Sequence, residues 1–226
     1  MSQTNMDRQQ GSEILKICTN IIGARDEYTQ GHSHHVYVVT EAIFEAGHFP
    51  IDREKLAHAA LLHDIGKILV PENVLNKDCS LSDEEWEIIR QHPVSGCNLL
   101  QGTMFEDIGD WILYHHERMD GKGYHGLSGD GIPLASRIIA VADTFSALRT
   151  YRAYRPAKSI QDTIRILKEA AGTQLDANVV QTLLSYDEDF LEALECNCEI
   201  CKRRKEAEHE KALSEKINLQ SLPLYR

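Results

Sequence analysis

Apolar residues recur every three or four positions along most of the chain. In residues 12–24 this spacing places Ile14, Ile17 and Ile21 near one another on the surface of a helix. No run alternates apolar and polar residues with a period of two, so the pattern predicts no β-strand. The same periodicity predicts further helices over residues 33–50, 53–66, 81–100, 106–118, 133–151, 159–172 and 176–184. The expected fold is an all-α helical bundle with short loops and no internal repeat.

Residues with strong positional preferences set several of the expected helix ends. Ser33 is expected to cap the second helix, which should stop at Gly47. Ser82 and Glu85 form a capping-box pattern, in which each side chain accepts a hydrogen bond from the other residue's backbone N–H. Pro93 should break or restart the helix that follows, because proline lacks the N–H that a helix interior needs.

Composition and charge narrow the class of protein. The chain has 226 residues, of which 42% are hydrophobic, which suffices for one domain with a substantial core. The formal net charge of −11 argues against binding to duplex nucleic acid, and a small anionic substrate would require a local group of cations. No apolar run is long enough for a membrane span, no signal peptide is recognisable, and the scattered cysteines suggest a reducing compartment, so a cytoplasmic protein is expected.

The charge pattern changes near residue 186. Residues 187–199 contain six acidic residues and no Lys or Arg, and a highly charged, basic stretch follows. We therefore place the main domain at residues 10–186 and a charged appendage at 187–226. Three closely spaced cysteines in the appendage, with His209 as a fourth ligand, suggest zinc, but reduced thiols are favoured because the spacing is not that of a standard zinc finger. These cysteines are Cys196, Cys198 and Cys201.

Five histidines and two aspartates lie at expected helix ends or beside helix-breaking residues. They are His32, His63, Asp64, His92, His115, His116 and Asp143. Each alone is explained equally well by a core or surface role. However, Asp64 follows the apolar run AHAALL, and a buried ionised carboxylate must be paired or coordinate a metal. Together the seven residues predict a site for two metal ions with Asp64 between them, and a donor set rich in imidazole favours iron, manganese or another first-row transition metal over calcium or magnesium.

Several ordered motifs carry a resemblance to a known family. The segments LLHDIGKILVPENVLNK, HHERMDGKGYHGLSG, RIIAVADTFSAL and RAYRPA resemble the HD-GYP subgroup of the HD-domain phosphohydrolases over about residues 20–185. The resemblance implies a helical bundle with a dinuclear or trinuclear iron or manganese centre. It also implies hydrolysis of cyclic di-GMP to pGpG or GMP, or of a related cyclic dinucleotide.

Residue roles follow from the same resemblance. It implies that His32, His63, Asp64 and Asp143 hold one metal and that Asp64, His92, His115 and His116 hold the second. Asp64 and Lys67 would be catalytic, with Lys67 on the scissile phosphate. Arg152 and Arg155 would bind phosphate, and Tyr124 would lie near the guanine-binding surface. Without the resemblance, Lys67, Arg152 and Arg155 fit a solvated charged face equally well.

The chain departs from the subgroup's pattern at a few positions. His125 replaces the proline of Gly-Tyr-Pro, which predicts a looser loop because proline's fixed φ is lost. Ser146 stands where many members have an aspartate, which predicts a weaker second layer of contacts around the metal. Gly23 and Glu27 occupy positions where trinuclear members place metal ligands, which favours two metals over three.

The expected function is metal-dependent hydrolysis of cyclic di-GMP. Two alternatives stay open: hydrolysis of another cyclic dinucleotide or nucleotide, and a catalytically weak module that binds cyclic di-GMP and signals through partners. The expected small-molecule partner is a cyclic dinucleotide. The sequence leaves open a homodimer, a signalling-protein partner, and whether the chain is a free-standing enzyme or an output domain.

Overall fold

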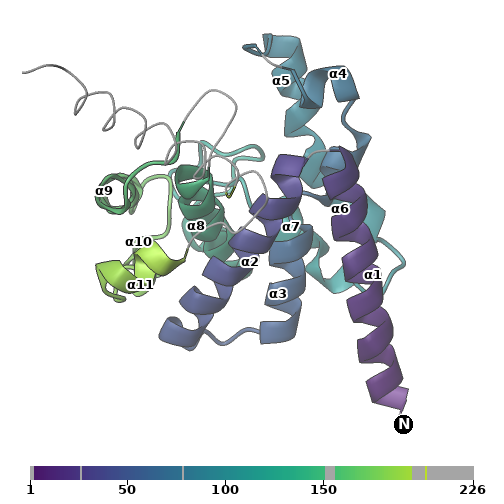
Figure 1. The fold of residues 1–226 in the computed structure, drawn as a ribbon, viewed down its shortest axis with the longest axis horizontal. Coiled ribbons are helices and arrows are strands. Elements are labelled where there is room, and N and C mark those ends of the chain that lie inside the picture. The colour runs from purple at the N-terminus through teal and green to yellow at the C-terminus, as the bar shows by residue number, and fades with distance from the viewer. Residues whose placement is uncertain (1–2, 26, 78, 151–155, 195–201, 203–226) are drawn as a thin grey trace, which may run out of the picture.

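The computed structural model describes residues 3–25, 27–77, 79–150, 156–194 and 202, and the regular secondary structure of these residues is helical (Figure 1). No β-strand occurs among them, and the only strand-like pairing that they contain is one isolated bridge between Ala171 and Leu175. The predicted all-α fold is confirmed. Among the described residues, no helix combines the length and the apolar character that a membrane crossing requires.

Eleven α-helices and three short 3₁₀ helices follow one another in the described residues. The helices that build the main body are α1 (Gln3–Arg25), α2 (Glu27–Gly47), α3 (Arg53–Leu62), η1 (Ile65–Leu69), α4 (Glu72–Leu75), α5 (Asp83–Arg90), α6 (His92–Leu100), η2 (Glu106–Ile108), α7 (Gly109–Leu113), η3 (Gly129–Gly131) and α8 (Leu134–Arg149). Three more complete the fold: α9 (Ile160–Ala170), α10 (Ala177–Leu183) and α11 (Glu188–Ala193).

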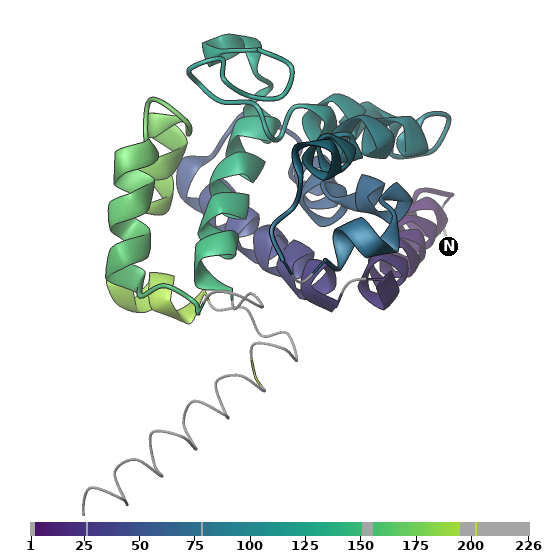
Figure 2. The ribbon, with the colours of Figure 1, turned by 90° about the horizontal axis from the view of Figure 1, so that it is seen from above.

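Helices α2 and α8 pack against each other at the centre of the bundle. Helix α3 and the long helix α1 lie on one side of this pair, and α9, α10 and α11 lie on the other (Figures 1 and 2). Val36, Val39 and Ile43 of α2 and Ile138 and Phe145 of α8 are fully buried between these layers. The central pair carries two of the site residues described below, His32 on α2 and Asp143 on α8.

Several predicted helix boundaries are wrong. Helix α1 begins at Gln3 rather than at residue 12, and α3 ends at Leu62 rather than at residue 66. Helix α2 begins at Glu27 rather than at Ser33, and Ser33 is buried inside the helix instead of capping it. Helix α7 ends at Leu113, well before the predicted residue 118. The capping box of Ser82 and Glu85 is present at the start of α5.

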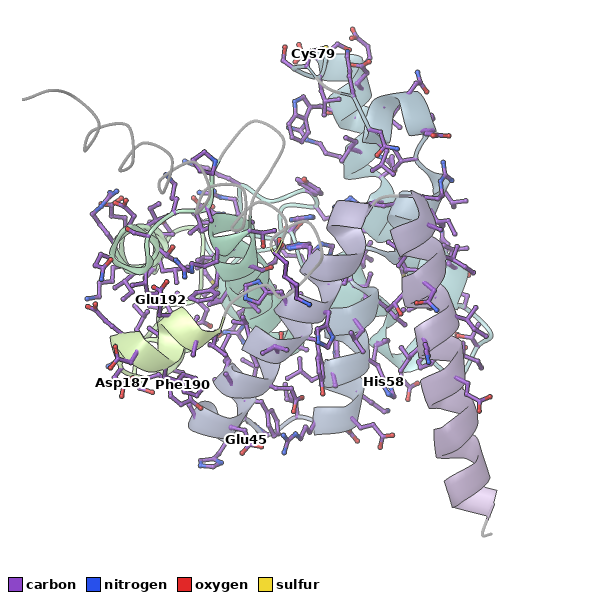
Figure 3. All side chains as sticks on the ribbon, in the orientation of Figure 1. Glu45, His58, Cys79, Asp187, Phe190 and Glu192 are labelled. Atoms are coloured by element: carbon purple, nitrogen blue, oxygen red, sulfur yellow. The ribbon has the colours of Figure 1, made fainter. Side chains whose placement is uncertain are left out.

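The core continues past the predicted domain boundary at residue 186. Leu191 of α11 is 1% exposed, and both it and Leu194 belong to the central apolar cluster. Glu192, labelled on α11 in Figure 3, pairs with Arg149 of α8 at 2.7 Å. The first part of the predicted appendage is thus packed on the main body. The proposed zinc ligands Cys196, Cys198, Cys201 and His209 lie outside the described residues.

A close backbone approach joins the segment after α3 to the start of α6. A Cβ atom on Gly66 would lie 1.9 Å from the carbonyl oxygen of His92, so only glycine fits. The opposing Gly96 is also close, because a Cβ there would lie 3.4 Å from the backbone nitrogen of Gly66. This contact brings Asp64 and His92 to the same point in the structure.

Candidate metal centre

The seven predicted ligand residues come from five segments and meet at one place. His32 lies on α2, Asp143 on α8, and His92 at the start of α6. His63 and Asp64 follow the end of α3, and His115 and His116 occupy the turn after α7. Because α3 and α7 end where they do, each adjacent pair is in a turn. There its two side chains can face the centre together.

Two groups of donor atoms lie close enough to hold one ion each. In each group, one ligand atom per residue lies within 4.8 Å of all the others. The first group is His32, His63 and Asp64, and the second is Asp64, His92, His115 and His116. Asp143 joins the first group through His32, since its Oδ1 lies 2.8 Å from His32 Nε2. Asp64 belongs to both groups, as expected of a bridging carboxylate.

Three of the imidazoles are oriented by the same backbone contact. In each case the ring Nδ1 lies within hydrogen-bond distance of the carbonyl oxygen three residues earlier. The pairs are His63 with Ala60, His92 with Ile89, and His115 with Ile112, at 2.8, 2.8 and 2.6 Å. A carbonyl oxygen only accepts, so Nδ1 carries the proton and the Nε2 lone pair points towards the centre. This tautomer is the one required for metal binding through Nε2.

His32 is oriented by a side chain instead. Its Nδ1 lies 2.8 Å from the hydroxyl oxygen of Ser146, which is fully buried on α8. The serine hydroxyl reaches the imidazole and can accept its Nδ1–H, so position 146 does supply a contact to His32. The expectation that this contact is weaker than that of an aspartate stays a prediction. His32 Nε2 is left facing Asp143.

The carboxylate of Asp64 is the most deeply embedded charge in the cluster. The residue is 2% exposed, with Oδ2 2.7 Å from Lys67 Nζ and Oδ1 3.2 Å from His92 Nε2. Oδ2 also lies 3.3 Å from His63 Nε2, but without the geometry of a hydrogen bond. Among the described residues this buried nitrogen has no hydrogen-bond partner. A buried Nε2 without a hydrogen-bond partner, next to a shared carboxylate, fits the role of a metal ligand.

Burial and charge set the protonation states that a metal site needs. Burial lowers the pKa of His116 to about 4, against the opposing charge of Asp143, and burial with the neighbouring imidazoles holds the pKa of His115 well below its usual range. Burial alone would raise the pKa of Asp64, but Lys67 and His63 hold it well below its ordinary value. At neutral pH these imidazoles are neutral and this carboxylate is ionised, the forms that bind metal.

The pKa of His63 shows that the electrostatic potential at the centre is negative. Burial lowers its pKa, but the adjacent charge of Asp64, aided by Asp143, raises it above the ordinary value. The two carboxylates therefore favour a positive charge at this point, whether a proton or a cation. Five imidazoles, two carboxylates and no thiolate fit a pair of divalent first-row transition ions.

A cavity of about 250 Å³ opens beside the centre. His115, His116 and Asp143 line it on the metal side, and Lys122 and Tyr124 line it on the loop side. The Tyr124 ring lies 4.8 Å from the His116 ring, so the predicted substrate residue does adjoin the ligands. Lys67 is placed at the centre by its ion pair with Asp64. Arg152 and Arg155 fall outside the described residues, and their phosphate-binding role stays a prediction.

Glu117 holds the loop that carries Tyr124, a role that the sequence pattern did not predict. This buried carboxylate accepts hydrogen bonds from the backbone N–H groups of His125 and Leu127, at 2.6 and 2.7 Å. A Cβ on Gly123 would lie 2.5 Å from Glu117 Cα, so the loop folds tightly over the residue. Proline at position 125 has no N–H to donate. This contact opposes the expected loosening of the loop by His125, and the effect of position 125 on the loop stays a prediction that the variant below tests.

Comparison with known proteins places this geometry in a family. The family model described as "HD domain" matches residues 16–179, which include all seven predicted ligands. The chain belongs to the HD domain family. HD-domain phosphohydrolases bind divalent metals, and the His and Asp cluster is in place to do so here.

Relatives of this HD domain include named phosphodiesterases. The chain is 32% identical over 181 residues to "3'3'-cGAMP-specific phosphodiesterase 1" of Vibrio cholerae, covering 78% of this chain and 42% of the relative. It is 34% identical over 194 residues to a "Cyclic di-GMP phosphodiesterase" of the same organism, covering 82% and 37%. The chain thus spans less than half the length of these relatives. The predicted HD-GYP resemblance is confirmed.

A solved structure supports the HD fold independently. Bd1817, an HDG"Y"P protein from Bdellovibrio bacteriovorus, superimposes with a TM-score of 0.56 at 23% identity. The match covers 71% of this chain and 51% of that one. At this identity the likeness shows the fold of the HD domain alone.

The contact between Ser146 and His32 predicts a metal-affinity defect in Ser146→Ala. Losing an orienting partner of a metal-binding histidine should weaken binding at the first ion group by about 10- to 100-fold. Titration of the metal-free protein with Mn(II) measures this. Ser136→Ala, which removes another buried hydroxyl of α8 whose partner is the Trp111 carbonyl, should bind both ions normally. Unchanged affinity in Ser146→Ala would show that the hydroxyl does not support His32.

The contact between Glu117 and the loop predicts that His125→Pro loosens residues 118–127. The variant loses a hydrogen bond to a buried carboxylate, worth about 1.5–3 kcal/mol, whereas His125→Ala keeps the backbone N–H. Trypsin should therefore cut after Arg118 or Lys122 faster in the proline variant than in the alanine variant. Equal cleavage rates would mean that the carboxylate does not hold the loop.

Proposed function

We propose that this chain hydrolyses a phosphodiester bond of a cyclic dinucleotide, converting cyclic di-GMP to pGpG or GMP. The observation that carries the proposal is the pair of donor groups sharing buried Asp64, set beside a cavity with cationic side chains. Iron or manganese is the proposed metal, because the donor set is dominated by imidazole.

The seven side chains divide between two ions. His32, His63, Asp64 and Asp143 would hold the first, and Asp64, His92, His115 and His116 would hold the second. When bound, a pair of divalent ions lowers the pKa of a water nucleophile and stabilises charge on phosphoryl oxygens. The protein's own contribution is to align His63, His92 and His115 through their Nδ1 contacts and to keep His115 and His116 neutral by burial.

Cations around the cavity would orient the phosphate. Lys67 Nζ is only partly buried and lies 2.7 Å from Asp64, so it can reach both the centre and an incoming phosphate oxygen. Lys122 lines the cavity from the loop. Arg152 and Arg155 are proposed to complete this group. Such local cations are needed because a chain of net charge −11 repels an anionic substrate at long range.

A second candidate substrate is 3'3'-cGAMP. It is supported by the relative whose name specifies that nucleotide and which is as similar to this chain as the cyclic di-GMP enzymes are. A binding module without turnover is a weaker candidate, because the ligand set has no missing member. Turnover of cyclic di-GMP, 3'3'-cGAMP and cyclic di-AMP, measured with one metal-loaded preparation, distinguishes these candidate functions. The preferred nucleotide identifies the substrate, and no turnover of any nucleotide would favour the binding module.

Asp64→Ala and Lys67→Ala should separate metal binding from substrate handling. Asp64→Ala removes the shared carboxylate and should lose both metals and all turnover. Lys67→Ala should keep two metals per chain but lose turnover about 10- to 150-fold, the effect of about 1.5–3 kcal/mol from one charged hydrogen bond. Metal analysis and cyclic di-GMP turnover with Fe(II) or Mn(II) check both. Full metal content and activity in Asp64→Ala would contradict the proposal.

A further inference from the structure

A second cavity, of about 480 Å³, lies on the outer side of Tyr124. One face of α5 forms its other wall, with Asp83, Trp86, Glu87 and Arg90 at successive turns of the helix. Tyr124 lines both this cavity and the one at the metal centre. The two cavities are therefore neighbours that share an aromatic wall.

The side chains of this cavity are unusual for a solvated surface. Trp86 is 46% exposed and Tyr124 is 38% exposed, although large aromatic rings are usually well buried. Arg90 lies 5.8 Å from the centre of the Tyr124 ring, which places a cation over its face. Two exposed aromatic rings and a guanidinium around one hollow are the side chains that stack on nucleobases.

The polar rim of the cavity is formed by acidic side chains of α5. Glu84 is engaged with Ser82, and Glu87 is engaged with Arg90. Asp83, on the same rim, has no hydrogen-bond partner among the described residues. A carboxylate can accept from the N1–H and N2–H groups of guanine together, whereas adenine presents an N1 lone pair that a carboxylate repels.

We infer that the cavity between α5 and Tyr124 is a guanine subsite, with Trp86 as its stacking face and Asp83 reading the Watson–Crick edge of the base. This inference rests on the proposed function, because it takes the base of the cyclic dinucleotide whose phosphate lies at the metal centre. Tyr124 separates the base from the ligand His116, which its ring contacts. Specificity would thus depend on α5, which carries no metal ligand.

Binding to the chelator-treated chain tests the subsite without any need for hydrolysis. The chain has two tryptophans, so Trp111→Phe leaves Trp86 as the only indole. In that background, cyclic di-GMP should change the tryptophan fluorescence saturably and bind at least tenfold more tightly than cyclic di-AMP. No saturable change, or equal affinity for the two nucleotides, would overturn the inference.

Variants on α5 locate the contact by calorimetric titration. Trp86→Ala should weaken cyclic di-GMP binding about tenfold, the loss expected for one stacking face, whereas Ile88→Ala, an exposed α5 residue that does not line the cavity, should not. Asp83→Asn should reduce the preference for cyclic di-GMP over cyclic di-AMP. Asp162→Asn, which removes a first-turn carboxylate of α9, controls for charge. Unchanged binding in Trp86→Ala would overturn the inference.

A base-free diester separates this inference from the proposed function. Metal-loaded wild-type protein should hydrolyse both methyl 4-nitrophenyl phosphate and cyclic di-GMP, and failure on both would reject the proposed function. In Trp86→Ala, the ratio of kcat/KM for cyclic di-GMP to that for the base-free diester should fall about tenfold. An unchanged ratio with both activities intact would reject the guanine subsite alone.

Discussion

The charge on one buried carboxylate is the constraint on which the rest of the centre depends. An ionised Asp64 at 2% exposure would be strongly destabilising without compensation, because a buried charge must be paired or bind a metal. Lys67 supplies part of that compensation at 2.7 Å. Asp64 also belongs to both donor groups, so a cation bound in either group would offset the rest of its charge. Five segments of chain therefore have to meet at this point.

The fold meets this constraint with backbone geometry. Helices α3 and α7 end just before the His63–Asp64 and His115–His116 pairs, which puts each pair in a turn. Backbone carbonyls then fix three imidazoles in the tautomer that leaves Nε2 free to bind. Gly66 allows the backbone of η1 to touch that of α6. The main chain thus orients three of the five imidazoles, whereas His32 is oriented by the side chain of Ser146.

The sequence predicted the all-α fold, and it grouped seven residues that the structure brings together, because both leave local signals. Helical periodicity is visible within a short window, and histidines beside helix ends are unusual enough to be grouped from the amino-acid pattern alone. The contacts that the pattern did not predict are not local. His32 and Ser146 are 114 positions apart, and the effect of the serine depends on how α2 packs against α8. The role of Glu117 depends on a loop that folds back over it. Likewise, the acidic composition near residue 187 indicated a domain boundary, although Leu191 and Leu194 pack this segment against the core.

The most direct test of the shared-carboxylate centre is anomalous diffraction from crystals of the chain reconstituted with manganese. Two anomalous peaks should flank the Asp64 carboxylate. His32, His63 and Asp143 should surround one peak, and His92, His115 and His116 should surround the other. A single peak, or peaks that do not contact Asp64, would contradict the account.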